Sequence, residues 1–258
     1  MPSTKGLHYF LHEGGDRSRP PVVLLHGTGG SHLSWPPEIR RLSGYRVFAL
    51  DLPGHGKSAG VGLQSAADYA RSVIEFMDAA LLWKAVFIGH SLGGAIALTL
   101  ALDHTERVAG LGLIACGARV PVPASILENS VNPATVQLAC QSLLDGLFGP
   151  QVDARLVEQS AKRLAEVRPA VLHGDLLACD AFDVSLSLET IHIPTLVLCG
   201  TEDRTTPLQL SKTLANSIPS AALQTVDGAG HAVMLEQPRR VASLLNVFLS
   251  TVPYLPGV

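Results

Sequence analysis

The stretch that decides the fold is Ala85-Val86-Phe87-Ile88-Gly89-His90-Ser91-Leu92-Gly93-Gly94. Its first four residues form a continuous apolar run, which is typical of a parallel strand covered on both faces. The residues Leu92–Leu102 are apolar nearly all round, as in a helix packed between neighbours. Glycines on either side of Ser91 let strand and helix approach closely and leave the serine hydroxyl exposed at the carboxyl edge of the sheet. The helix N-terminus behind it favours developing negative charge. The stretch therefore predicts a nucleophilic Ser91.

Similar short apolar runs alternate with longer helical patterns along the rest of the chain. We expect further strands at Leu7–Leu11, Val22–Leu25, Val47–Leu50, Leu111–Ala115, Thr195–Cys199 and Leu223–Val226. Helices are expected at Ala66–Leu81, Pro207–Ser217 and Pro238–Phe248, the last two opened by a proline, which suits the first helical turn. This alternation predicts an α/β fold with a doubly wound, mostly parallel sheet.

One segment, residues 120–188, interrupts the alternation and has only helical patterns, such as Pro133–Leu147 and Val152–Val167. We interpret it as a helical cap inserted into a core domain made of residues 1–119 and 189–258. Its apolar residues exceed what a lone helical pair needs, so they either pack on the core domain or also line a pocket for an apolar substrate group. The candidates for substrate contact are Leu127, Leu143, Leu147, Phe148 and, from the core domain, Trp35, for which core packing is the alternative.

A serine hydroxyl needs a base, and His231 is the best placed of the ten histidines. It lies in Asp227-Gly228-Ala229-Gly230-His231, a glycine-rich loop between the last strand and the last helix. A carboxylate must orient the imidazole. We expect this to be Asp203, in the loop after the penultimate strand, with the adjacent Glu202 as its rival. The remaining histidines, His8 and His32 among them, have no supporting context, and His90 is assigned to packing.

A glycine-rich loop, His26-Gly27-Thr28-Gly29-Gly30, follows the strand Val22–Leu25. Such a loop can turn backbone N–H groups toward a reacting oxygen. The oxyanion hole is therefore predicted at the amides of Thr28 and Leu92, and His26 is expected to brace the loop.

The composition of the chain argues against several classes of partner and site. The 258 residues carry a net charge of −3 with no Lys/Arg run, which argues against nucleic acid. The four cysteines form no CxxC pair, so a zinc ribbon or redox motif is not expected. No signal-peptide core and no apolar run of roughly 20 residues is visible. We expect a cytoplasmic monomer or homodimer with a small-molecule partner, without metal, cofactor or membrane.

With these motifs in this order, the chain resembles the α/β-hydrolase-fold superfamily, in its capped, carboxylesterase-like branch of serine hydrolases. The resemblance rests on His26–Gly30, Asp51–Ser58, Gly89–Gly93, Gly200–Pro207 and Gly228–His231. In most members the second of these segments is structural. The resemblance implies a Ser91, His231 and Asp203 triad that hydrolyses carboxylic esters of small to medium apolar acyl groups through an acyl-enzyme.

Several relatives within the superfamily are disfavoured. Haloalkane dehalogenases and epoxide hydrolases use aspartate where this chain has Ser91. Carbon–carbon bond hydrolases often carry Gly-Pro in the oxyanion loop and tryptophan after the catalytic histidine, where this chain has Gly29-Gly30 and Ala232. Hydrolysis of lactones or thioesters, cofactor-free perhydrolysis, a ligand receptor that retains the triad, and a non-catalytic scaffold stay open.

Overall fold

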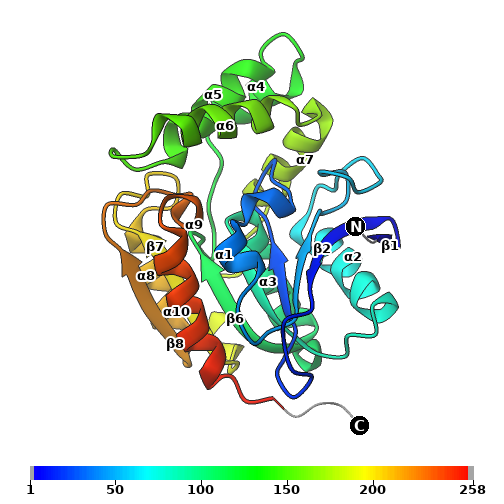
Figure 1. Cartoon of the computed structure of the whole chain (residues 1–258). Helices are drawn as coiled ribbons and strands as arrows, with labels where there is room; N and C mark the ends of the chain where they lie inside the picture. Colours follow the sequence, from blue (N-terminus) through cyan, green and yellow to red (C-terminus); the bar gives the residue numbers. More distant parts are fainter. Residues whose placement is uncertain (1–2, 255–258) are drawn as a thin grey trace.

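The computed structural model describes residues 3–254, and its centre is an eight-stranded sheet with strand order β1-β2-β4-β3-β5-β6-β7-β8 (Figure 1). Strands β3 to β8 are parallel, and β1 and β2 add an antiparallel edge. The bounds are β1 (Ser3–Thr4), β2 (Leu7–His12), β3 (Val22–Leu25), β4 (Val47–Leu50), β5 (Ala85–His90), β6 (Val108–Ile114), β7 (Thr195–Gly200) and β8 (Ala221–Val226). The predicted mostly parallel, doubly wound sheet is confirmed.

Helices cover both faces of this sheet, as the continuous apolar strands require. On one face, α2 (Ala66–Ala79), α3 (Leu92–Asp103) and α8 (Leu208–Ser217) close one hydrophobic core. On the other face, α1 (Pro37–Arg40), α9 (Val233–Glu236) and α10 (Pro238–Thr251) close a second core. The short helices η1 (His32–Ser34), η2 (Thr105–Arg107) and η3 (Leu188–Thr190) lie in the connections.

Four helices stand between β6 and β7, in the segment predicted as the cap. They are α4 (Ala124–Val131), α5 (Val136–Leu147), α6 (Ala154–Ala165) and α7 (Pro169–Asp180). Figure 1 shows α4, α5 and α6 as a layer at one end of the sheet, with α7 leading back toward it. Val136, Cys140, Leu172 and Leu176 form a small core of their own within these helices. The helical patterns in the sequence correspond to α5 and α6, whereas α4 and α7 were not predicted individually.

Strand β6 begins three residues before its predicted start. Gly110 and Gly112 weakened the strand pattern in the sequence, but the neighbouring strand and helix approach too closely for larger side chains. A Cβ atom at Gly112 would lie 3.0 Å from Ile88, and one at Gly110 would lie 3.2 Å from Val252. Among residues 3–254, no helix is both long and apolar enough to cross a bilayer.

Candidate active site

Ser91 occupies a strained turn between β5 and α3. Its φ is +53° and its ψ is −118°, a region that non-glycine residues rarely adopt. A Cβ atom at Gly89 would overlap the Gly93 carbonyl, and one at Gly93 would overlap the Leu25 carbonyl of β3. The turn is fixed further by the Ser91 N–H, which donates to the Ile114 carbonyl at 3.0 Å. The two glycines therefore bring β5, α3 and β3 together closely enough to hold Ser91 in this conformation.

His231 and Asp203 meet at the same edge of the sheet, from the loops after β8 and β7. His231 Nδ1 lies 3.0 Å from Asp203 Oδ2, and both side chains are buried. Asp203 Oδ1 accepts the Thr205 N–H at 2.9 Å and the Thr206 N–H at 2.8 Å, and the Thr206 hydroxyl donates to Oδ2 at 2.7 Å. Glu202, the rival acid, has an exposed side chain. The structure thus brings Asp203, and not Glu202, to His231.

The charge state of Asp203 follows from these contacts. Burial alone would raise the pKa of its carboxyl, but the hydrogen bond and charge of His231, together with the donors of Thr206, lower it below its ordinary value. Asp203 is therefore ionised at neutral pH, which keeps the proton of His231 on Nδ1 and leaves Nε2 as an acceptor.

Two further residues hold the His231 loop. His90, assigned to packing from the sequence, donates from Nε2 to the His231 carbonyl at 3.0 Å, and burial lowers its pKa to about 3, so its ring is neutral. Glu236 on α9 accepts the Gly230 N–H at 2.8 Å and the Gly149 N–H at 3.0 Å, and so ties the loop to the cap segment. Nothing in the spacing of Glu236 within the sequence indicated this contact.

In the glycine-rich loop 26–30, the Thr28 N–H points away from the hydrogen bonds that the loop makes within itself. The Gly27 carbonyl accepts His26 Nδ1–H at 2.9 Å and the Gly30 N–H at 3.0 Å. The peptide bond between Gly27 and Thr28 is trans, so the Thr28 N–H points to the opposite side from that carbonyl. In the described part of the chain, neither this amide nor that of Leu92 donates to another group. Two unengaged N–H donors thus lie near Ser91.

His26 braces this loop, as predicted. Its Nε2 accepts the Leu52 N–H at 3.1 Å while its Nδ1 donates to Gly27, so the ring must be neutral. Burial, followed by the nearby charge of His55, lowers the pKa of His26 to about 4. Replacing it with a charged side chain would remove both contacts at once.

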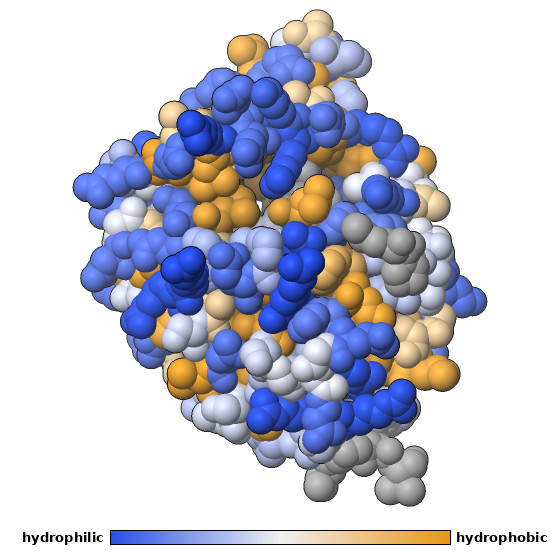
Figure 2. All heavy atoms as spheres, in the orientation of Figure 1, coloured by the Kyte–Doolittle hydropathy of each residue, from blue (hydrophilic) through white to orange (hydrophobic). Residues whose placement is uncertain are grey.

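A cavity of about 420 Å³ lies between the cap helices and the core domain. Thr28, Ser91, Leu92 and His231 line its floor, and its walls are mainly apolar side chains from the cap segment, including Val122, Ile126, Leu143, Leu147 and Leu164. Figure 2 shows hydrophobic atoms on both sides of a narrow opening between the cap and the rest of the molecule. The candidate nucleophile, base and N–H donors therefore share one largely apolar cavity.

Three of the predicted substrate contacts do not line the cavity, and for Trp35 the structure shows the alternative, core packing. Trp35 is fully buried in the core beneath α1 and α10, Leu127 packs on the small core of the cap, and Phe148 is buried at the end of α5. None of the three is among the described residues that line the cavity. The apolar pattern predicted burial of these side chains, but it could not distinguish burial in a core from exposure to a cavity. Leu143 and Leu147 do line the cavity.

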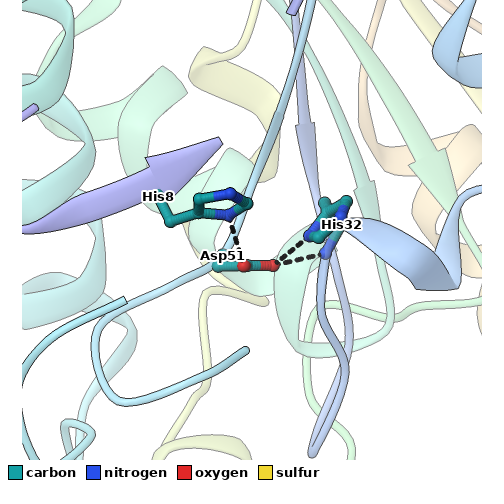
Figure 3. A group of neighbouring side chains, drawn as sticks. All are labelled: His8, His32 and Asp51. Carbon is teal, nitrogen blue, oxygen red and sulfur yellow. Dashed lines mark hydrogen bonds and ion pairs between the residues drawn. The ribbon is translucent and has the colours of Figure 1, made fainter. Parts of the chain in front are cut away.

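Asp51, directly after β4, forms a cluster with His8 of β2 and His32 of η1, drawn in Figure 3, and these residue types could hold a metal ion. Both rings turn Nδ1 toward the Asp51 carboxylate, His8 at 2.7 Å and His32 at 2.8 Å. The carboxylate also accepts the His32 N–H at 2.6 Å and the Lys57 N–H at 3.0 Å. Four N–H donors occupy its lone pairs, so the cluster fits a hydrogen-bonded support better than a metal site.

This cluster accounts for the Asp51–Ser58 segment. Burial would raise the pKa of Asp51, but the hydrogen bonds from His32 and Lys57 hold it well below its usual range. The ionised carboxylate links β2, the loop after β3 and the loop after β4. It therefore anchors His32, two residues after the glycine-rich loop 26–30.

We expect the free energy of unfolding to fall as the pH drops from 6.5 toward 4. His26 and His90 have pKa values of about 4 and about 3 in the folded protein, against 6.5 as the ordinary value. In this window the unfolded chain binds protons that the folded chain does not. The free energy of unfolding therefore falls by about 1.4 kcal/mol per pH unit for each histidine. Urea unfolding of the wild type and of His90→Gln at several pH values checks this. A slope that His90→Gln leaves unchanged contradicts it.

Comparisons with known proteins agree with the fold. The family model for the alpha/beta hydrolase fold matches residues 20–238. A putative carbamate hydrolase, RutD, from Pseudomonas syringae pv. syringae strain B728a is 32% identical over 250 residues, which are 91% of this chain and 95% of that relative.

Solved structures are similar over nearly the whole chain. A thermophilic esterase is 32% identical with a TM-score of 0.83, covering 97% of this chain and 96% of its own. Est816, described as an N-acyl homoserine lactone degrading enzyme, is 26% identical with a TM-score of 0.82, covering 94% and 96% of the two chains. The strand order, the Ser91 turn and these similarities agree: the chain belongs to the α/β-hydrolase fold family.

Proposed function

We propose that the protein is a serine hydrolase that cleaves carboxylic esters of small to medium apolar acyl groups through an acyl-enzyme. One observation carries the proposal: a single apolar cavity is lined by Ser91, by His231 with Asp203 behind it, and by the free amides of Thr28 and Leu92. A strained serine, an oriented imidazole and paired N–H donors are the parts that acyl transfer requires.

The mechanism follows from the position of each group. Ser91 Oγ attacks the ester carbonyl while His231 Nε2 takes its proton, and Asp203 stabilises the imidazolium that forms. The carbonyl oxygen becomes negative and is bound by the Thr28 and Leu92 amides, each worth about 3 kcal/mol in the transition state. His231 then gives the proton to the departing alcohol. A water molecule, activated by the same imidazole, releases the acid and restores Ser91.

The walls of the cavity support an apolar acyl group as substrate. A volume of about 420 Å³ falls within the range of small-molecule sites, and no aspartate or glutamate is among the described residues that line it. A neutral or anionic substrate fits this lining better than a cationic one, because an apolar cavity without carboxylates offers a cation no counter-charge.

A lactone or a carbamate is the second candidate substrate class. The relatives named above as a carbamate hydrolase and as a lactone-degrading enzyme favour it. Both substrates present a carbonyl to the same nucleophile, so the attack by Ser91 is unchanged: the alkoxide released from a lactone stays attached to its acyl part, and a carbamate carries nitrogen on the acyl side of its carbonyl. Rates on p-nitrophenyl esters from acetate to long acyl chains, compared with aliphatic lactones and ethyl carbamate, separate these classes.

The cap should set the preference for acyl length. We expect Leu143→Ala and Leu147→Ala to shift the preferred acyl chain to greater length, because each removes apolar bulk from the cavity wall. The shift in relative kcat/KM should be about 10-fold between chain lengths two carbons apart. Leu138→Ala is the control, since Leu138 lies on the same helix but is 57% exposed. Identical profiles for all four proteins count against a cap-determined specificity.

A further inference from the structure

We propose that Asp175, on cap helix α7, is a positioning residue that fixes the direction of the Thr28 amide; this rests on the proposed function. The Asp175 side chain is fully buried, and its Oδ2 accepts the Gly29 N–H at 2.8 Å. Gly29 directly follows the residue whose amide is the candidate oxyanion donor. A carboxylate from the cap thus contacts the oxyanion loop 146 positions earlier in the chain.

The Thr28 N–H lies in the peptide plane that it shares with the Gly27 carbonyl, and the position of that plane depends on the neighbouring plane after Thr28. The plane before Thr28 is held at the Gly27 carbonyl by His26 and by the Gly30 N–H. The plane after Thr28 carries the Gly29 N–H, which Asp175 accepts. Gly29 itself has a φ of +63°, in the left-handed region that glycine adopts readily, so its own backbone restricts this plane little. Without Asp175, hydrogen bonds hold the peptide plane before Thr28 but not the plane after it.

The Asp175 side chain is surrounded by groups that donate hydrogen bonds to its carboxyl oxygens. His55 Nε2 lies 2.8 Å from Oδ2, and the Tyr69 hydroxyl donates to Oδ1 at 2.6 Å. The other ring nitrogen of His55 lies 3.1 Å from the Pro53 carbonyl, so both nitrogens face acceptors, as suits the protonated ring. Burial would lower the pKa of His55, but the hydrogen bond and charge of Asp175 raise it. The Asp175 carboxyl thus faces the His55 ring and two further donors, the Tyr69 hydroxyl and the Gly29 N–H.

These contacts distinguish a positioning role from simple cap docking. Another cap residue, Arg168, also contacts the core domain, donating to the Gly54 carbonyl at 2.9 Å and the Gly60 carbonyl at 2.6 Å. Arg168 touches no residue of the loop 26–30 through these bonds. If cap docking alone mattered, removal of either contact would have the same effect.

The experiment compares Asp175→Ala, Asp175→Asn, Arg168→Ala and the wild type. An oxyanion donor acts mainly in the transition state, so we expect Asp175→Ala to lower kcat on p-nitrophenyl esters about 10–100-fold with KM changed less than threefold. Asp175→Asn keeps one carbonyl oxygen for Gly29 and should recover part of this loss. Arg168→Ala should keep kcat within twofold of the wild type.

A fluorophosphonate provides the second readout, because its phosphoryl oxygen needs the same N–H donors when Ser91 is labelled. Asp175→Ala should be labelled more slowly by the same factor as its kcat falls. Labelling at the wild-type rate, or an equal loss of kcat in Arg168→Ala, overturns the proposal. If Asp175→Ala does not fold by circular dichroism, Asp175→Asn carries the test, and wild-type kcat in that variant overturns it. A wild type that is not labelled at Ser91 contradicts the proposed function itself.

Discussion

Replacing Ser91 with alanine is expected to lower kcat for ester hydrolysis by about 10⁴–10⁶, because the nucleophile and the base act as one unit. The fold should persist. The strained turn is imposed by the close approach of β3, β5 and α3, which the alanine side chain leaves unchanged. Steady-state kinetics on p-nitrophenyl butyrate and urea unfolding measure the two effects.

The control for this variant is Ser142→Ala, since Ser142 also lines the cavity but lies on α5. We expect Ser142→Ala to retain the wild-type kcat within a few-fold. Wild-type activity in Ser91→Ala would show that Ser91 is not the nucleophile.

Replacing Asp203 with asparagine is expected to lower kcat by about 10⁴ with little change in fold. The amide keeps the shape of the carboxylate but presents an N–H to His231, and this favours the tautomer in which Nε2 carries the proton and cannot accept one. The measurement is kcat from pH 6 to pH 9.

Glu202→Gln is the matched control for Asp203, because it makes the same chemical change one residue away on an exposed side chain. It should leave kcat unchanged. An equal loss in both variants would mean that the loop, and not the Asp203 carboxylate, is responsible.

Much of the fold could be predicted because the central strands, β3 to β7, are buried on both faces. Val22–Leu25 and Val47–Leu50 are uninterrupted apolar runs, and the structure forms strands over the same residues. The candidate site could be predicted from the sequence for a related reason. The carboxyl ends of parallel strands meet at one edge of the sheet. Polar residues directly after strands, such as Ser91 and Asp203, therefore come together there regardless of the conformation of the loops.

The rest depended on contacts that sequence patterns do not encode. An apolar residue such as Trp35 gives the same signal whether it faces a core or a cavity. Asp175 is an acid on a largely apolar helix, and only the packing of α7 in the folded chain brings it to Gly29, His55 and Tyr69. The His8 and His32 contacts to Asp51 likewise join three segments that lie far apart in the sequence.

The most direct test is to identify the covalent intermediate. The wild type is mixed with a slowly hydrolysed p-nitrophenyl ester, quenched in acid during turnover, digested and examined by mass spectrometry. The account predicts an acyl group on the peptide that contains Ser91, formed in a burst of p-nitrophenol equal to the enzyme concentration and absent from Ser91→Ala. Continued turnover with no adduct on that peptide, or the same adduct at another residue in Ser91→Ala, would contradict it.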